Sequence, residues 1–174
     1  VREGKVNPPL PYPHVYNSDG NKDNSITFTF TVEKASVSID GALHSSIGAG
    51  MLVLLGVETG DTPADLEWLV GKVARLRIFD DSEGVMNLDV VDSKGEIMVV
   101  SQFTLCASTK KGNRPSYIAA AREDEAVPMY EAFKSRLGEL TGREVACGVF
   151  GADMAVELIN DGPVTIWIDS RNRF

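Results

Sequence analysis

A continuous apolar run at residues 51–57, Met-Leu-Val-Leu-Leu-Gly-Val, is the feature that most constrains the fold. It shows no polar alternation, which is typical of a β-strand covered on both faces. From Ser25 onward, a different pattern indicates a half-buried strand, with apolar residues alternating with threonines: Ile26, Phe28, Phe30 and Val32. The chain therefore has to build a sheet with covering layers.

Two helices are expected beside these strands. Thr62-Pro63-Ala64-Asp65 supplies an N-cap, a proline at the first helical position and an acidic first turn. A second apolar stripe runs from Val127 to Leu140 and stops at Thr141-Gly142, a common helix end. Further strands are predicted at 35–39, 42–47, 96–105, 145–150, 154–159 and 164–169, with Asp40-Gly41 as a hairpin turn. The prediction is a single strand-rich α+β domain with two main helices and β/β/α layered or barrel-like sheets.

The chain of 174 residues, 43% of them apolar, fits one domain. Residues 1–24 contain four closely spaced prolines and then a polar run, so we expect a poorly ordered extension to which no function is assigned, and a domain at 25–174. Cys106 and Cys147 cannot form a disulfide framework and lack zinc-site spacing. A cytoplasmic location is the default expectation.

The net charge of −8 argues against binding of nucleic acid by general attraction, and DNA is not an expected partner. A local contact with the end of an RNA stays open. No apolar stretch approaches the roughly 18 residues of a membrane span. No metal or cofactor motif is present in the sequence.

Residues for acid–base catalysis are scarce. The histidines are His14, in the extension, and His44, on a predicted hairpin arm, so a Ser-His-Asp triad is not expected. Both cysteines are interpreted as small hydrophobic residues rather than nucleophiles. Carboxylates are available, but their positions in turns and helix starts are explained by solvation and capping.

The segment Ser101-Gln102-Phe103-Thr104-Leu105 places polar groups at the exit of an apolar strand. In a strand Gln102 and Thr104 share one face, so an amide and a hydroxyl could position an ester carbonyl together. They could equally satisfy neighbouring backbone groups. Asp161-Gly162-Pro163 is interpreted first as an ordinary turn.

Ser101–Leu105 and Asn160-Asp161-Gly162-Pro163-Val164-Thr165 resemble the two segments that define the D-aminoacyl-tRNA deacylase family. The likeness spans about residues 32 to 170 and also covers 35–37, 52–57, 76–79, 86–88, 111–116 and 150–154. It implies an ester hydrolase that removes D-amino acids, and mischarged glycine, from tRNA as proofreading in translation. It also implies a homodimer and no cofactor.

The resemblance implies that Ser101, Gln102, Phe103 and Thr104 line the ester, while the ribose 2′-hydroxyl of the substrate assists attack by water. It implies that Gly162 and Pro163 are joined by a cis bond and enter the active site of the other subunit. There, with Asn160, Val164 and Thr165, they reject L-amino acids. Contacts with the tRNA acceptor end are expected at Lys110, Lys111, Arg114, Phe150 and Met154.

One departure concerns the first strand, where Phe30-Thr31-Val32 aligns with a usual Gln-Arg-Val, so Thr31 replaces an arginine. The alternatives are a sister group with a trans Gly-Pro bond that tolerates some L-aminoacyl-tRNA, and a catalytically silent module that binds the tRNA acceptor end. A third is a strand-rich dimerisation domain without tRNA binding.

Overall fold

The structure is a computed structural model that describes residues 25–171. The described chain is rich in strands and has two α-helices, and the predicted extension at 1–24 lies outside the described residues. In chain order they are β1 (Ile26–Ile39), β2 (Ala42–Ile47), β3 (Gly50–Gly56), α1 (Pro63–Val73), β4 (Phe79–Asp80), β5 (Met86–Leu88), β6 (Glu96–Ser101), the 3₁₀-helix η1 (Phe103–Cys106), α2 (Glu123–Thr141), β7 (Val145–Cys147) and β8 (Met154–Asp169).

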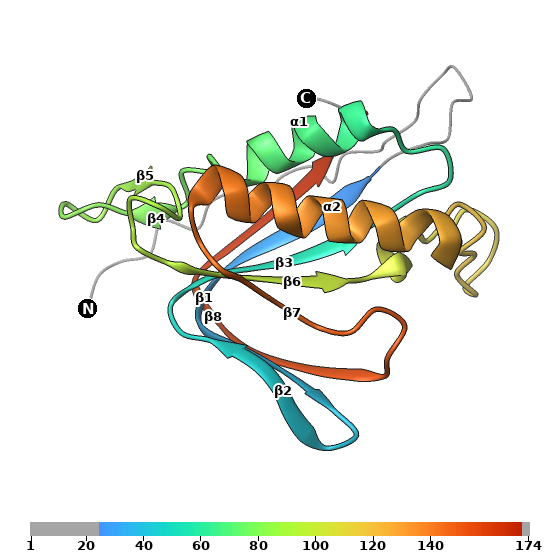
Figure 1. Cartoon of the computed structure of the whole chain (residues 1–174), viewed down its shortest axis with the longest axis horizontal. Coiled ribbons are helices and arrows are strands. Elements are labelled where there is room, and N and C mark those ends of the chain that lie inside the picture. The colour runs from blue at the N-terminus through green and yellow to red at the C-terminus, as the bar shows by residue number, and fades with distance from the viewer. Residues whose placement is uncertain (1–24, 172–174) are drawn as a thin grey trace.

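One mixed sheet forms the body of the molecule, in the order β2-β1-β3-β6-β7, with β8 paired along the other side of β1 (Figure 1). Strands β3, β6 and β7 run parallel to one another, whereas β1 is antiparallel to all its partners. The sheet curls until β2 meets β7, where the Ser45 hydroxyl donates to the Cys147 carbonyl at 2.7 Å. This confirms the predicted α+β domain with a barrel-like sheet.

Two apolar clusters occupy the two faces of the sheet. Alternate residues of β3 divide between them: Met51 and Val53 face the helices, while Leu52 faces the inside of the curl. Both clusters are buried, which explains why the 51–57 run has no polar alternation. Figure 1 shows α1 and α2 side by side over the same face of the sheet. No helix in the described range 25–171 is long and apolar enough to cross a membrane.

Both helices follow their predicted signals. Thr62 caps α1 through a reciprocal capping box with Asp65. Helix α2 ends where expected, since Gly142 adopts a left-handed conformation with φ 63°, but it begins at Glu123, earlier than the apolar stripe indicates. The Asp40-Gly41 hairpin turn is also confirmed, with positive φ at both residues.

Candidate functional site

The polar segment after β6 turns sharply instead of continuing as a strand. We predicted a strand to Leu105, but β6 ends at Ser101 and η1 follows. The turn packs against Gly56, where a β-carbon would lie 3.1 Å from the Gln102 carbonyl oxygen and from Cys106 Sγ. The strand prediction for 102–105 was therefore wrong because β3 has already ended and the backbone folds over its last glycine.

Gln102 and Thr104 nevertheless meet. The Gln102 side-chain amide donates to Thr104 Oγ1 at 2.5 Å. Both residues are half-buried, and Phe103 between them is exposed. The first hydrogen bond of η1 runs from Leu105 N–H to the Gln102 carbonyl, so the N–H groups of Phe103 and Thr104 have no acceptor within the helix. The turn thus gathers an amide, a hydroxyl and main-chain donors.

A pocket of about 300 Å³ opens beside this turn. Its walls come from the end of β6 with the turn, the start of α2, the loop after β7 and the start of β8. Ser101, Gln102 and Phe103 line it together with Phe150 and Met154, which the sequence assigned to tRNA contact. The chain therefore brings together residues that lie some fifty positions apart in the sequence.

The floor of the pocket is apolar and fixed. Tyr130 is buried, and its hydroxyl donates to the Val99 carbonyl at 2.8 Å. Its ring lies 5.9 Å from that of Phe150. Burial raises the pKa of Tyr130 far above its ordinary value, so the hydroxyl stays neutral. Sequence analysis missed Tyr130 because its place in the stripe of α2 looks like an ordinary core position.

The pocket offers no histidine or cysteine among its lining residues. His44 is exposed on β2, and His14 lies outside the described residues. Cys106 is buried, and burial together with the charges of Glu58 and Asp61 raises the pKa of its thiol to about 12. Within 25–171 no group of three or more His, Cys, Asp or Glu side chains could hold a metal ion.

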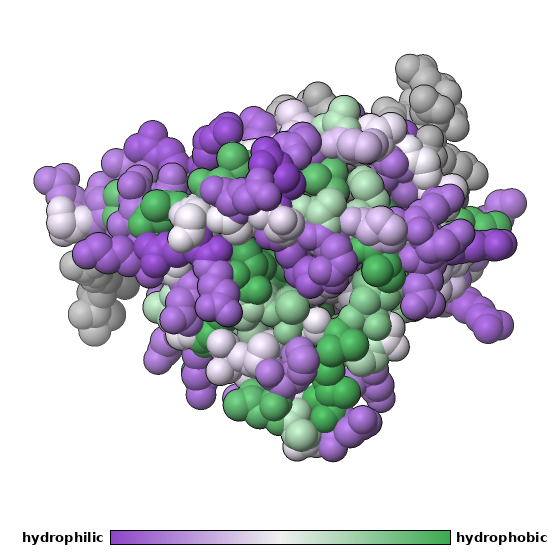
Figure 2. All heavy atoms as spheres, viewed as in Figure 1, coloured by the Kyte–Doolittle hydropathy of each residue, from purple (hydrophilic) through white to green (hydrophobic). Residues whose placement is uncertain are grey.

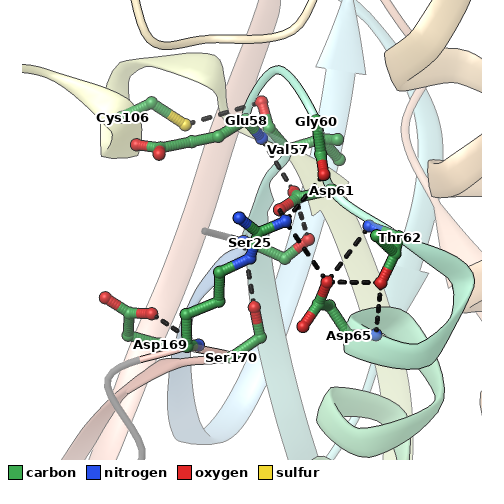
Figure 3. A network of polar contacts seen from close by, with 11 residues as sticks. Ser25, Val57, Glu58, Gly60, Asp61, Thr62, Asp65, Cys106, Asp169 and Ser170 are labelled. Atoms are coloured by element: carbon green, nitrogen blue, oxygen red, sulfur yellow. Dashed lines mark hydrogen bonds and ion pairs between the residues drawn. The ribbon is translucent and has the colours of Figure 1, made fainter. Parts of the chain in front are cut away.

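A polar network fixes the loop behind the turn (Figure 3). Cys106 Sγ lies 3.6 Å from the Val57 carbonyl, and the Glu58 N–H donates to Asp61 at 2.9 Å. Ser25 also donates to Asp61. Arg171, near the end of the described chain, donates to the Gly60 carbonyl at 2.6 Å. The C-terminal segment therefore anchors the loop against which the turn packs.

Two carboxylates share the guanidinium of Arg171 in this network. Its Nη2 lies 3.4 Å from Asp65 and 4.0 Å from Asp61. Burial raises the pKa of Asp61 above its ordinary value despite the hydrogen bonds from Ser25 and Glu58. Burial acts in the same sense on Asp65, but hydrogen bonds from Thr62 and the charge of Arg171 outweigh it, so the pKa of Asp65 is lowered.

Gly162 and Pro163 lie on a bulge of β8. Phe30 pairs with Thr165 and Val32 with Asn160, so residues 161–164 all stand opposite Thr31. Asn160 and Thr165 lie within 3.4 Å of each other across the base of the bulge. Gly162 has φ 117°, and a β-carbon there would lie 3.0 Å from the Val164 side chain, so glycine is required. The bulge unites all five residues that the sequence assigned to chiral selection.

The prediction of a cis bond between Gly162 and Pro163 is wrong, because residues 25–171 contain no cis peptide bond. A trans X-Pro bond is favoured by about 0.5–1 kcal/mol unless packing reverses the preference. Both residues are exposed in this chain, so packing within the chain is too slight to reverse it. The interpretation of 161–163 as a break between two strands is also wrong, since β8 is continuous from Met154 to Asp169.

The bulge cannot reach the pocket of its own chain. Thr31 pairs with Met51, which pairs with Ile97, whereas Ser101 lies four residues further along β6. Four strand residues span about 13 Å, and three strand spacings of roughly 4.8 Å separate β8 from β6. Neither Gly162 nor Pro163 lines the pocket. The two predicted halves of the site are therefore separate within one chain.

The predicted phosphate-binding residues lie on a closed loop after η1. Ser108 and Ser116 exchange backbone hydrogen bonds of 2.8 and 2.9 Å, and this bridge closes a loop that carries Lys110, Lys111 and Arg114. All three are exposed. The loop starts directly after η1 and lies at the same end of the molecule as that turn (Figure 1).

Comparison with known families identifies one that matches residues 30–169, described as D-Tyr-tRNA(Tyr) deacylase. Curated relatives named D-aminoacyl-tRNA deacylase are similar over nearly their whole length. The Parabacteroides distasonis protein is 60% identical, covering 84% of this chain and 98% of its own. The Porphyromonas gingivalis protein is 61% identical, covering 82% of this chain and 95% of its own.

Solved structures show the same fold. One described as "c-Myc DNA Unwinding Element Binding Protein" is 38% identical with a TM-score of 0.78, covering 82% of this chain and 97% of its own. Another, described as a probable eukaryotic D-amino acid tRNA deacylase, is 16% identical with a TM-score of 0.72, covering 84% of this chain and 99% of its own. At that identity the second likeness concerns the fold alone.

Proposed function

The chain belongs to the D-Tyr-tRNA(Tyr) deacylase family, and from this membership we propose that it hydrolyses the ester bond of D-aminoacyl-tRNA, releasing the free D-amino acid and tRNA. The observation that supports this activity is the 60% identity to a D-aminoacyl-tRNA deacylase over 98% of that protein. Such hydrolysis is a proofreading step of translation, which implies a cytoplasmic enzyme. Glycine, which has no side chain to exclude, would be removed from mischarged tRNA by the same site.

The turn after β6 binds the ester. Gln102 lines the pocket, and its amide meets the hydroxyl of Thr104, so an amide and a hydroxyl lie side by side next to the pocket. The N–H groups of Phe103 and Thr104 are the donors available to an oxyanion that develops on the ester carbonyl. Ser101 lines the pocket at the preceding position.

The pocket itself receives the terminal nucleoside of the tRNA. The ester joins the amino acid to the terminal ribose, so a site that holds the ester must also accommodate the attached base. The apolar walls at Phe150 and Met154 suit a flat base, and Gln102 lies at the same opening as the ester. This arrangement explains why apolar residues separated from the turn by the whole of α2 belong to the site.

The reaction proceeds by attack of water without a protein nucleophile. The lining of the pocket contains no histidine or cysteine, and the Cys106 thiol stays neutral behind the turn. An ester is already reactive, so positioning and stabilisation of the oxyanion can supply the acceleration. The neighbouring ribose 2′-hydroxyl of the substrate assists the water, and Thr104 positions rather than attacks.

The site is completed by a second copy of the chain. Gly162 and Pro163 are exposed and cannot reach their own pocket, so they serve the pocket of a partner. Within 25–171, β8 pairs only with β1, which leaves its other edge open to a partner. Carbonyl groups of the bulge, placed near the α-carbon of the substrate, would leave room for hydrogen but not for an L side chain. Lys110, Lys111 and Arg114 meet phosphates of the acceptor end.

A second candidate function is deacylation with relaxed chirality. The trans bond between Gly162 and Pro163 favours it, because a trans Gly-Pro bond characterises the sister group that tolerates some L-aminoacyl-tRNA. Deacylation of D- and L-tyrosyl-tRNA at matched enzyme concentrations decides between the two. We expect hydrolysis of the D ester with the L ester left intact. Comparable rates would assign the relaxed activity, and binding of tRNA without turnover would leave only a silent binding module.

A further inference from the structure

Three apolar side chains project into solvent next to the pocket. Ile118 is 87% exposed, Phe103 57% and Tyr117 40%. The rings of Phe103 and Tyr117 lie 5.2 Å apart in an edge-on arrangement, so they form one continuous surface. Phe103 also lines the pocket, which makes this surface an extension of the pocket rim. We call Phe103, Tyr117 and Ile118 the rim platform.

The backbone holds the platform in its outward position. Ser116, directly before Tyr117, is bridged to Ser108. Ala119, directly after Ile118, accepts a 3.0 Å hydrogen bond from the Thr59 N–H. Tyr117 and Ile118 therefore occupy a two-residue span between anchored positions, so their exposure is built into the loop rather than a result of a loose segment.

The charges near the rim platform indicate which class of ligand it binds. The chain carries a net charge of −8, yet the loop closed by Ser108 and Ser116, which directly precedes Tyr117, carries the exposed cations Lys111 and Arg114. Figure 2 shows apolar side chains among hydrophilic ones at the right-hand edge, where Figure 1 places the loop after η1. Exposed aromatic side chains next to cations are the arrangement that binds single-stranded nucleic acid, with bases on the rings and phosphates at the cations.

We propose that the rim platform binds the unpaired nucleotides that precede the terminal nucleoside of the substrate tRNA. This inference rests on the proposed function, because it requires the terminal nucleoside in the pocket. The RNA chain leaves the pocket over Phe103, and the base that precedes the terminal nucleoside lies against Tyr117 and Ile118. The platform thus distinguishes an esterified tRNA from a free esterified nucleoside, which shares the ester but lacks the preceding nucleotides.

The test compares two substrates in the double variant Tyr117→Ser/Ile118→Ser. On D-tyrosyl-tRNA we expect kcat/KM to fall about ten- to a hundredfold, mainly through KM. On the D-tyrosyl ester of adenosine we expect kcat/KM to stay within about twofold of the wild type. Leu140→Ser, at an exposed apolar position at the far end of α2, is the matched control and should keep the wild-type rate on both substrates.

Competition supplies a second measurement that does not need turnover of the adenosine ester. A trinucleotide with the terminal sequence of tRNA should inhibit the wild type more strongly than adenosine 5′-monophosphate, and the double variant should lose this preference. An unchanged kcat/KM on D-tyrosyl-tRNA in the double variant, or an equal loss of kcat/KM on both substrates, would overturn the proposed role of the rim platform. Failure of the wild type to hydrolyse D-tyrosyl-tRNA would instead be a failure of the proposed function.

Discussion

Thr31 donates its hydroxyl hydrogen to the carbonyl oxygen of Asp161, and so ties β1 to the base of the Gly162-Pro163 bulge within one chain. Thr31 is the position at which the resemblance described in the sequence analysis implied an arginine, and its hydroxyl makes this contact with the bulge. This side-chain contact adds to the backbone pairing of β1 with β8 on both sides of the bulge.

Thr31→Val should loosen the bulge while keeping the fold. Valine has nearly the same shape, so only the hydrogen bond of about 1 kcal/mol is lost. We expect the ratio of kcat/KM for D- over L-tyrosyl-tRNA to fall about three- to tenfold. Thr29→Val, two residues earlier on the same face, is the matched control and should leave this ratio unchanged. An unaltered ratio in Thr31→Val would show that the bulge keeps its shape without the hydroxyl.

Thr104→Ala should reduce hydrolysis of D-tyrosyl-tRNA without abolishing it. The variant loses one positioning hydrogen bond with Gln102, for which about a tenfold decrease in kcat is expected. Removal of the 2′-hydroxyl from the substrate should cost more than removal of the Thr104 hydroxyl. Trapping of an acyl group on Thr104 in the wild type, with full activity on the 2′-deoxy substrate, would reverse these roles.

Two inactive variants should restore activity when mixed. Gln102→Ala damages the pocket, and Gly162→Val distorts the bulge that is proposed to act in the other subunit. After exchange of subunits, half the dimers are mixed and each contains one intact site, so about a quarter of wild-type activity should return. Sedimentation should give twice the mass of the 18.8 kDa chain. An active monomer, or no restoration in a mixture shown to contain mixed dimers, contradicts completion in trans.

Thr29→Val should stabilise the protein. Thr29 is fully buried, and its Oγ1 has no hydrogen-bond partner among the described residues. Replacing an unsatisfied hydroxyl by a methyl group of similar size should raise the free energy of unfolding by about 1 kcal/mol. Thr29→Ser, which keeps the hydroxyl and loses the methyl, should lower it. Chemical denaturation of the three proteins measures both changes.

Arg171→Met should destabilise the protein in a pH-dependent manner. At neutral pH Asp61 and Asp65 are both charged and lose their shared cation, so we expect a loss of about 2 kcal/mol. Without Arg171 the pKa of each carboxyl rises, so the variant takes up protons at a higher pH than the wild type. The loss should therefore shrink as the pH falls and the carboxylates are protonated.

Arg136→Met is the control for this prediction. It removes a cation of similar size whose carboxylate partners, Glu67 and Glu139, lie at the surface. Ion pairs at the surface contribute little to stability because water and salt screen them. Thermal unfolding between acidic and neutral pH compares the two variants, and a loss in Arg171→Met that is constant with pH would exclude the shared-cation explanation.

Local signals in the sequence predicted the helices and most strands. The capping box at Thr62 and the left-handed Gly142 act through neighbouring residues, so a short window is enough to detect them. The short hairpin of β4 and β5 went unpredicted, because two- and three-residue strands are too short for a period to show. The turn at 102–106 depends on its packing against Gly56, a contact between distant residues.

The site was predictable only in part, because local sequence signals do not show which distant residues meet. The two motif segments pointed to Gln102, Thr104 and Gly162-Pro163, but spacing could not show that the bulge lies far from its own pocket. That separation follows from the pairing of β8, β1, β3 and β6, which no local pattern encodes. The pocket wall at Tyr130 was missed because a residue that lines a cavity and one that fills a core have the same helical period.

The length of the continuous strand β8 sets the distance between the pocket wall and the Gly162-Pro163 bulge. Its first residues, from Met154, form a wall of one pocket, and its bulge at 161–164 is the part proposed to enter the pocket of the partner. Each residue inserted or deleted between them would change their separation by about 3.3 Å and turn the intervening side chains to the opposite face. The length of this one strand thus determines how far the bulge proposed to enter the partner lies from the pocket of its own chain.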